Sequence, residues 1–172
     1  MDAIRANIPF HVDLQVAIDD AKLPGGVEWS LWAGTALELA AVKRRAGTRM
    51  TVRLVGLDES RQLNKTYRKK DSATNVLAFR GADGDDWLTD EECELGDLAI
   101  CLPIVYAEAE EQGKQPLAHM AHLVVHGTLH LAGLDHQDDV NAERMEQLET
   151  QIMRRLGFSD PYIEVSGRLR GE

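Results

Sequence analysis

The chain has 172 residues, of which 44% are hydrophobic and 28% are charged, and its formal net charge is −10. This length supports one domain with a single buried core. The sequence has no apolar run of the roughly 20 residues that cross a bilayer, and its first residues, MDAIRANIPFHVDLQ, lack the pattern of a signal peptide. We therefore expect a cytoplasmic protein with no membrane partner. Cys93 and Cys101 lack C-x-x-C spacing and do not indicate a disulfide framework, so we expect Cys101 to be a buried free thiol.

The charges are segregated along the chain. Residues 43–80 hold 11 of the 19 Lys and Arg against three acids, a local net charge of +8, whereas residues 81–111 hold 11 acids and no Lys or Arg. Such blocks fit ordinary solvated surfaces. They also permit a face that binds a polyanion on an otherwise acidic protein.

The first half of the chain predicts two strands and two helices. Apolar residues alternate over 10–18, as in a half-buried strand, and recur at helical spacing over 29–41, with Gly47 placed to cap that helix. Residues 49–57 predict a second strand. Asp58 then fits the N-cap of the next helix.

The second half predicts two neighbouring strands, over 75–80 and 95–102, joined by the acidic insert 81–94. Three helices follow, over 103–113, 116–133 and from Asp138 or Asp139 to 157. The order predicts an α/β (α+β) fold with a small mixed sheet of about four strands covered by about five helices. We expect one metallohydrolase-like domain over residues 1–157 and a frayed tail over 158–172.

The segment HGTLHLAGLDH, residues 126–136, predicts a metal site. His126 and His130 are one helical turn apart on the same face, so both imidazoles can reach one ion. Gly133 can end the helix in a left-handed conformation and let His136 supply the third ligand. Three protein ligands leave a fourth position open, as in catalytic zinc sites, so one Zn²⁺ per chain is expected.

Other histidines share this face. A His122 and His126 pair has geometry as good as His126 and His130, but only the second pair explains the glycine turn and the third histidine. We therefore expect His122 to pack behind the ligands and His119 to lie at the surface.

The same segment matches the metzincin frame H-E-x-x-H-x-x-G-x-x-H except at Gly127, which replaces the catalytic Glu. A metal-dependent peptidase or amide hydrolase would need another general base. We expect Gly127 to leave open space beside the metal for a bulky substrate group.

The motifs resemble those of the YbeY family, the bacterial endoribonucleases and ribosomal RNA maturation factors. HGTLHLAGLDH resembles the family's H-G-x-L-H-L-x-G-Y-D-H, and Met145 with Glu149 fits its M-x-x-x-E pattern. The other similar segments are LNKTYRKKDSATNVLAF (63–79), LGDLAIC (95–101) and EAEEQG (108–113). This sequence departs from the family pattern at Asn75, Ala78, Arg80 and Leu134, where the family has Asp, Ser, Pro and Tyr.

The resemblance implies a zinc-dependent, single-strand-specific endoribonuclease that acts in 16S ribosomal RNA 3′-end maturation and ribosome quality control. It makes His126, His130 and His136 the zinc ligands and catalytic residues. Arg68, which from the residues alone fits a solvated helix-end cation equally well, becomes a catalytic phosphate ligand, with Lys69 and Lys70 binding substrate. The implied partners are single-stranded ribosomal RNA and the small ribosomal subunit with its associated proteins. A non-catalytic, zinc-stabilised ribosome-binding module is the remaining alternative.

Overall fold

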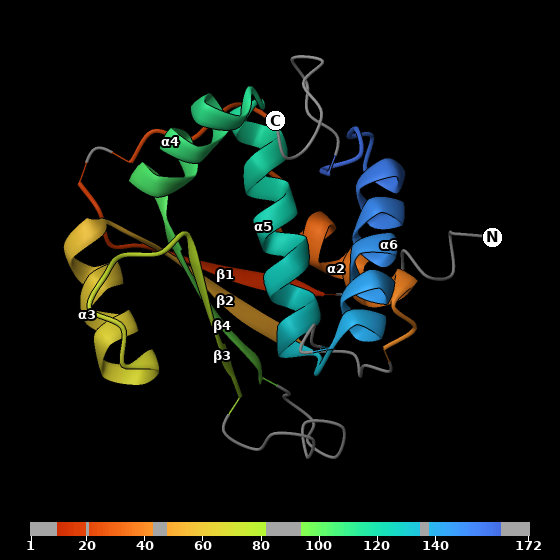
Figure 1. Cartoon of the computed structure of the whole chain (residues 1–172), viewed down its shortest axis with the longest axis horizontal. Helices are drawn as coiled ribbons and strands as arrows, with labels where there is room; N and C mark the ends of the chain where they lie inside the picture. The colour runs from red at the N-terminus through yellow and green to blue at the C-terminus, as the bar shows by residue number, and fades with distance from the viewer. Residues whose placement is uncertain (1–9, 20, 43–47, 82–93, 135–137, 163–172) are drawn as a thin grey trace.

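The computed structural model describes residues 10–19, 21–42, 48–81, 94–134 and 138–162. Four strands, β1 (His11–Val16), β2 (Arg49–Val55), β3 (Val76–Arg80) and β4 (Glu94–Cys101), form one mixed sheet. The helices are α2 (Trp29–Leu39), α3 (Leu57–Arg68), α4 (Leu102–Gln112), α5 (Pro116–Leu131) and α6 (Asp139–Arg155). The predicted fold class is confirmed (Figure 1).

The sheet has the order β1-β2-β4-β3. β1 pairs with β2 and β2 with β4 in parallel, whereas β3 runs antiparallel to β4 at the edge. This edge pairing confirms the prediction that the strands on either side of the acidic insert are neighbours. Because side chains alternate along a strand, Ala78 and its partner Leu98 face one side of the sheet, while Phe79 and its partner Asp97 face the other.

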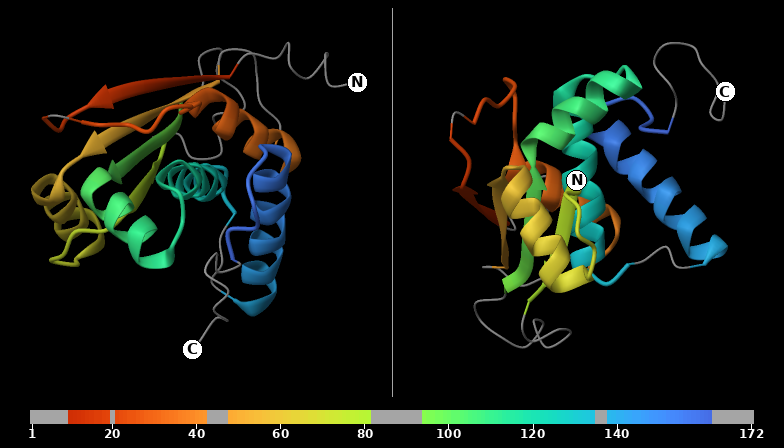
Figure 2. Two further views of the ribbon diagram at one scale, coloured as in Figure 1. Left: turned by 90° about the horizontal axis from the view of Figure 1, so that it is seen from above. Right: turned by 60° about the vertical axis from the view of Figure 1, so that its left-hand side comes forward.

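Helix α5 crosses the side of the sheet that Ala78 and Leu98 face, with α2 and α6 packed beside it (Figures 1 and 2). The core lies between these layers, where Leu98, Met120 and Leu129 are fully buried. Helix α3 lies on the opposite side, because its Tyr67 ring contacts the Phe79 ring with centroids 5.2 Å apart. The edge strand β3 therefore separates the end of α3 from the middle of α5.

Gly127 lets α5 approach the sheet closely. A Cβ atom at this position would lie 2.7 Å from Cδ2 of Leu98, well inside van der Waals contact. In the direction that a side chain at 127 would take, Leu98 of the core fills the space. The backbone of Gly127 nevertheless lines a cleft with His126 and His130, so the open space predicted beside these histidines is present there. The glycine is needed for helix-to-strand packing.

Helix ends agree with the sequence where a local signal is strong. Asp138 caps α6 by accepting a hydrogen bond from the backbone N–H of Asn141 at 2.8 Å, and Gly133 follows α5 with φ 98°. Two expected caps are wrong. Helix α2 ends at Leu39 with Ala40 as its C-cap, so the predicted cap Gly47, which lies outside the described residues, is not the end of this helix. Asp58 lies inside the first turn of α3, after the N-cap Gly56.

The described C-terminal residues pack against the domain. Phe158 contacts the ring of Trp32, with centroids 6.3 Å apart, and Tyr162 donates a hydrogen bond to Glu149 at 2.7 Å. The expected frayed tail therefore does not begin at 158, since residues 158–162 belong to the packed structure; residues 163–172 lie outside the described part of the chain. Cys101 is buried as a free thiol, as predicted. No helix among the described residues is long and apolar enough to cross a membrane.

Candidate active-site cleft

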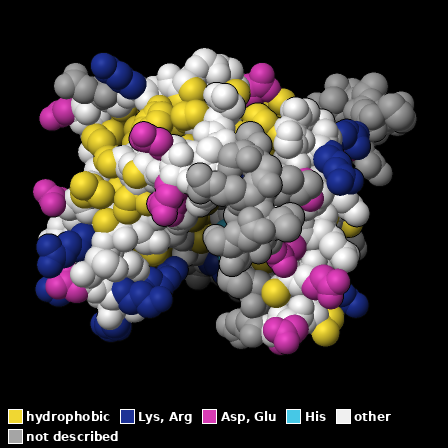
Figure 3. All heavy atoms as spheres, turned by 45° about the horizontal axis from the view of Figure 1, so that its top comes forward, with side chains coloured by type: hydrophobic (Ala, Val, Ile, Leu, Met, Phe, Trp, Pro, Cys, Tyr) yellow, Lys and Arg dark blue, Asp and Glu magenta, His cyan; other side chains and the backbone are white. Residues whose placement is uncertain are grey.

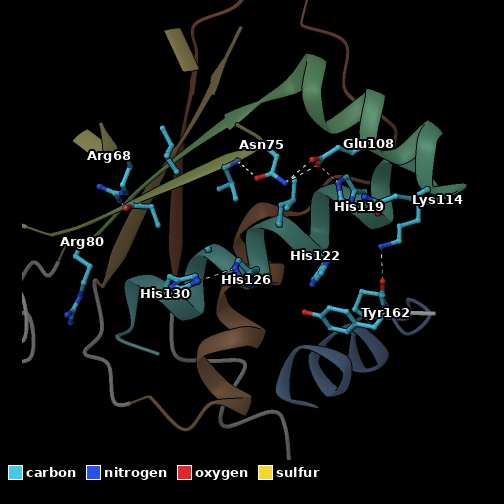
Figure 4. Close-up of a pocket in the computed structure, with 17 residues that line it drawn as sticks. Arg68, Asn75, Arg80, Glu108, Lys114, His119, His122, His126, His130 and Tyr162 are labelled. Carbon is cyan, nitrogen blue, oxygen red and sulfur yellow. Dashed lines mark hydrogen bonds and ion pairs between the residues drawn. The ribbon is translucent and has the colours of Figure 1, made fainter. Parts of the chain in front are cut away.

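A cleft of about 670 Å³ lies between the edge strand β3 and helix α5. Its residues come from the end of α3, from β3, α4 and α5, and from the segment that follows α6 (Figure 4). Three of the predicted site residues, Arg68, His126 and His130, meet here although Arg68 is far from the histidines in sequence. The antiparallel edge strand brings them together.

His126 and His130 face each other across one turn of α5. Their Nε2 atoms lie 3.1 Å apart, and their rings meet edge to face with centroids 4.6 Å apart. In a tetrahedral zinc site with Zn–N distances of about 2.0–2.1 Å, two ligand nitrogens are about 3.3 Å apart. The spacing of the two Nε2 atoms is therefore close to that of two ligands of one tetrahedral ion. His136, the third predicted ligand, lies outside the described residues, and no group of three or more His, Cys, Asp or Glu is gathered for a metal within the described ranges.

Glu149 of α6 holds His126 and His122 from behind. Its side chain is 1% exposed, and its two oxygens lie 2.9 Å from Nδ1 of His126 and 2.5 Å from Nε2 of His122. Burial raises the pKa of this carboxyl, but the hydrogen bonds from the two imidazoles outweigh burial and lower the pKa to about 2. An ionised Glu149 accepts a hydrogen bond from Nδ1–H of His126, which leaves Nε2 of that ring with its lone pair on the side of His130.

The segment after α6 closes the cleft behind Glu149. The hydroxyl of Tyr162 donates a hydrogen bond to Glu149, and its ring packs on the ring of His122, with centroids 5.4 Å apart. Lys114 holds the same segment by donating to the backbone carbonyl of Pro161 at 2.7 Å (Figure 4). Glu149 thus accepts three hydrogen bonds from side chains of two other segments.

A second carboxylate, Glu108 of α4, forms a separate cluster in the cleft. It accepts hydrogen bonds from Nε2 of His119 at 2.8 Å and from the amide of Asn75 at 3.0 Å. His119 is only 5% exposed, so the prediction that it lies at the surface is wrong. Asn75 can donate where the Asp of the family pattern would place two carboxylates side by side.

Arg68 and Arg80 line the end of the cleft nearest His130 (Figure 4). Arg68 donates to the backbone carbonyl of Ala78 at 2.6 Å, and its guanidinium lies 5.2 Å from the ring centroid of Phe79. The side chain is thereby fixed at the rim while still exposed. Lys69 and Lys70 are exposed beyond the end of α3 and do not line the cleft, so their predicted contact with substrate stays a prediction.

The basic block is partly neutralised by its own acids. Arg53 pairs with Glu59 at 2.6 Å, and Arg61 pairs with Asp71 at 2.7 Å. Lys and Arg side chains still gather on the side of the molecule where α3 lies, with a few acids among them (Figure 3). The polyanion attraction predicted for 43–80 stays a prediction, and Lys43, Arg44 and Arg45 of this block lie outside the described residues.

Comparison with known proteins settles the family. The family model described as endoribonuclease YbeY matches residues 18–157. The chain belongs to the endoribonuclease YbeY family. Endoribonuclease YbeY of Stutzerimonas stutzeri (strain A1501) is 48% identical over 156 residues, which cover 91% of this chain and 93% of the relative. That of Pseudomonas putida (strain W619) is 51% identical over 154 residues, covering 90% and 94%.

The fold has a counterpart among solved structures. The solution structure of TM1509 from Thermotoga maritima aligns with a TM-score of 0.52 over 92% of this chain and 100% of that chain, at 22% identity. This likeness supports the fold alone. Family membership confirms the resemblance predicted from the motifs, and with it the enzyme class, since the curated relatives are named endoribonucleases.

Proposed function

We propose that this protein is a zinc-dependent, single-strand-specific endoribonuclease that acts on ribosomal RNA. The observation that carries the proposal is the pair of Nε2 atoms, 3.1 Å apart, in a cleft whose rim holds Arg68 and Arg80. The curated relatives support RNA as the substrate class, because they carry the name endoribonuclease. A metal ligand pair beside the fixed guanidinium group of Arg68 suits the cleavage of a phosphodiester.

Each group has a defined task in this proposal. His126, His130 and His136 would hold the ion, which when bound supplies a Lewis acid and lowers the pKa of coordinated water. Arg68 binds the non-bridging phosphate oxygens, because its planar guanidinium stays charged and donates two parallel hydrogen bonds. Glu149 keeps the His126 ring in one tautomer and one orientation.

The dimensions of the cleft favour a single strand. At about 670 Å³ it is the size of an ordinary small-molecule site, which admits a nucleotide or two but not a duplex about twenty ångströms wide. We further propose 16S ribosomal RNA 3′-end maturation as the task, with the small ribosomal subunit and its proteins as partners in the cytoplasm. The exposed Lys69 and Lys70 would add attraction to RNA that weakens steeply with salt.

The peptidase alternative has less support. In the metzincin frame the general base stands at position 127, where the Cα of Gly127 is packed against Leu98 and a longer side chain has no room. The other carboxylate in the cleft, Glu108, contacts His119, which is two helical turns from His126. Glu149 does contact His126, but it is buried and does not line the cleft. No described carboxylate in the cleft therefore replaces the missing base beside the histidine pair.

The test combines metal content with RNA cleavage. Purified protein is expected to carry about one zinc per chain and to cut single-stranded RNA, and a chelator should abolish cleavage without unfolding the chain. Arg68→Ala should lower kcat by about 10²–10³, by analogy with the loss of one preorganised donor to a transition-state oxyanion. Lys65→Ala, which removes an equal charge from an exposed position on the same helix, is the matched control and should change cleavage little.

Three outcomes would contradict the proposal. Cleavage that survives chelation would remove the metal from the reaction. Unfolding on chelation, with no RNA cleavage by the zinc-loaded protein, would instead support the non-catalytic module, because structural zinc contributes folding free energy outright. Peptide cleavage that a chelator stops would revive the peptidase.

A further inference from the structure

The two ends of the cleft differ in charge. Arg68 and Arg80 line the end nearest His130, whereas Glu108 lies at the other end, beyond His126, where Lys114 is the one cation among the described lining residues (Figure 4). In the proposed reaction Arg68 binds phosphate and the histidines bind the metal, whereas Glu108 has no role. A bound RNA strand must nevertheless place some part of itself there.

Glu108 is held rigidly but stays accessible. Oε1 accepts from Nε2 of His119 at 2.8 Å and from Nδ2 of Asn75 at 3.0 Å, while Oε2 receives only the longer Asn75 contact of 3.3 Å. Asn75 is itself fixed, because its Oδ1 accepts from the backbone N–H of Val76 at 2.6 Å. The Glu108 side chain is 29% exposed although the His119 side chain beneath it is 6% exposed. Oε2 therefore keeps acceptor capacity toward the cleft.

The charge of this carboxylate restricts what can bind. A backbone phosphate beside Glu108 would be repelled, since two like charges in a partly desolvated cleft oppose each other. Lys114 lines the same end, but its ammonium donates to the carbonyl of Pro161 at 2.7 Å. A second metal ion would find too few ligands, because no three His, Cys, Asp or Glu are gathered for a metal in the described ranges. The fitting ligand is a neutral group that presents N–H donors.

We infer that the Glu108 end binds a nucleobase that carries an exocyclic amino group, and that Glu108 sets a base preference beside the scissile phosphate. This inference depends on the proposed ribonuclease function. Adenine, cytosine and guanine each present an amino group, whereas the N3–H donor of uracil lies between two carbonyl oxygens that a carboxylate repels. His119 and His126 are seven residues apart on α5, or about 10 Å along its axis, a separation on the scale of one nucleotide.

The test is cleavage of a random-sequence single-stranded RNA by the zinc-loaded protein, with base frequencies read at every position beside the cut. Wild type should disfavour uracil about tenfold at one flanking position, the low end of the range for a side-chain contact to a base edge. Glu108→Gln keeps the side-chain volume and an oxygen for His119, but its amide can donate to uracil, so the preference should fall to less than about threefold. Circular dichroism verifies that the variant is folded.

Glu110→Gln is the matched control. Glu110 lies on the same helix, is exposed and does not line the cleft, so this variant makes the same change in net charge and should keep the wild-type preference. The inference alone is overturned if wild type cuts RNA with no preference at any flanking position, or if Glu108→Gln keeps the full preference. Wild type that cuts no RNA at all overturns the proposed function, and the inference with it.

Discussion

The histidines of helix α5 form two pairs that differ in what stands opposite them. His119 and His122 each place Nε2 on a carboxylate from another helix, Glu108 at 2.8 Å and Glu149 at 2.5 Å. His126 and His130 instead turn their Nε2 atoms toward each other at 3.1 Å. All four residues share one stripe of the helix, so their spacing does not distinguish them. The partners decide which nitrogens can hold a metal.

The largest expected effect is a loss of zinc affinity that should occur on substitution in one histidine pair and not in the other. His130→Ala removes a proposed metal ligand and should weaken zinc binding by more than about 100-fold, beyond the range usual for residues that only support a ligand. His119→Gln, from the other pair, should leave zinc affinity within about threefold. Competition with a chromophoric chelator measures both. Equal losses in the two variants would remove the distinction between the pairs.

Glu149 joins the two pairs, and its loss should have the next largest effect. Glu149→Gln leaves one oxygen to serve both His122 and His126, so the His126 ring loses its fixed tautomer and zinc affinity should fall by about 10- to 100-fold. Tyr162→Phe removes only one of the three hydrogen bonds on this carboxylate, so its effect should be smaller. Zinc competition again supplies the measurement.

The control for this series is Glu143→Gln on an exposed position of α6, which should bind zinc as wild type does. If Glu149→Gln matched this control, the carboxylate would have no part in orienting His126. If Tyr162→Phe lowered zinc affinity more than Glu149→Gln did, the tyrosine would act on His126 and His130 by a route other than Glu149.

The sequence predicts the parts of this site that depend on local spacing. His126 and His130 are one turn apart, and Gly133 follows them with positive φ, because helix geometry and the lack of a Cβ fix both features. The strands and most helices are likewise set by the period of their apolar residues. These features need no knowledge of distant contacts.

The supporting residues could not be predicted in this way. Glu149 is 23 residues from His126 along the chain, and Glu108 is 33 residues from Asn75. Only the packing of α6 and α4 against α5 brings these side chains together. Glu149 did stand out as part of a family motif, but the motif gives no partner for it. The predicted surface position of His119 is wrong for the same reason, since a polar residue on an apolar helix does not indicate that a carboxylate lies opposite it.

Gly127 sets how closely the second pair approaches the sheet, and its substitution should have a moderate effect. Gly127→Ala places a methyl group 2.7 Å from the buried Leu98, which should cost about 1–3 kcal/mol in overpacking, partly offset by the better helix propensity of alanine. Gly34→Ala in α2 is the control, because its Cβ would meet Phe10 at an ordinary 3.6 Å. Urea unfolding should show the first variant destabilised and the second stabilised by up to about 1 kcal/mol. Stabilisation by both would mean that α5 can move away from β4.

The smallest expected effect concerns the first pair and pH. Burial lowers the pKa of His119; Glu108 opposes this shift, whereas Lys114 and His122 add to it. Below the unfolded pKa of about 6.5 the unfolded chain therefore binds more protons at this residue than the folded chain. The free energy of unfolding should consequently decrease as the pH falls from 6.5 through the lower folded pKa. His119→Gln keeps a donor for Glu108 but cannot titrate, so its unfolding free energy should decrease less than that of wild type between pH 7.5 and 5.5. Identical slopes in urea titrations of the two proteins would show that His119 accepts a proton in the fold as readily as in the unfolded chain, and that the buried pair with Glu108 tolerates an imidazolium.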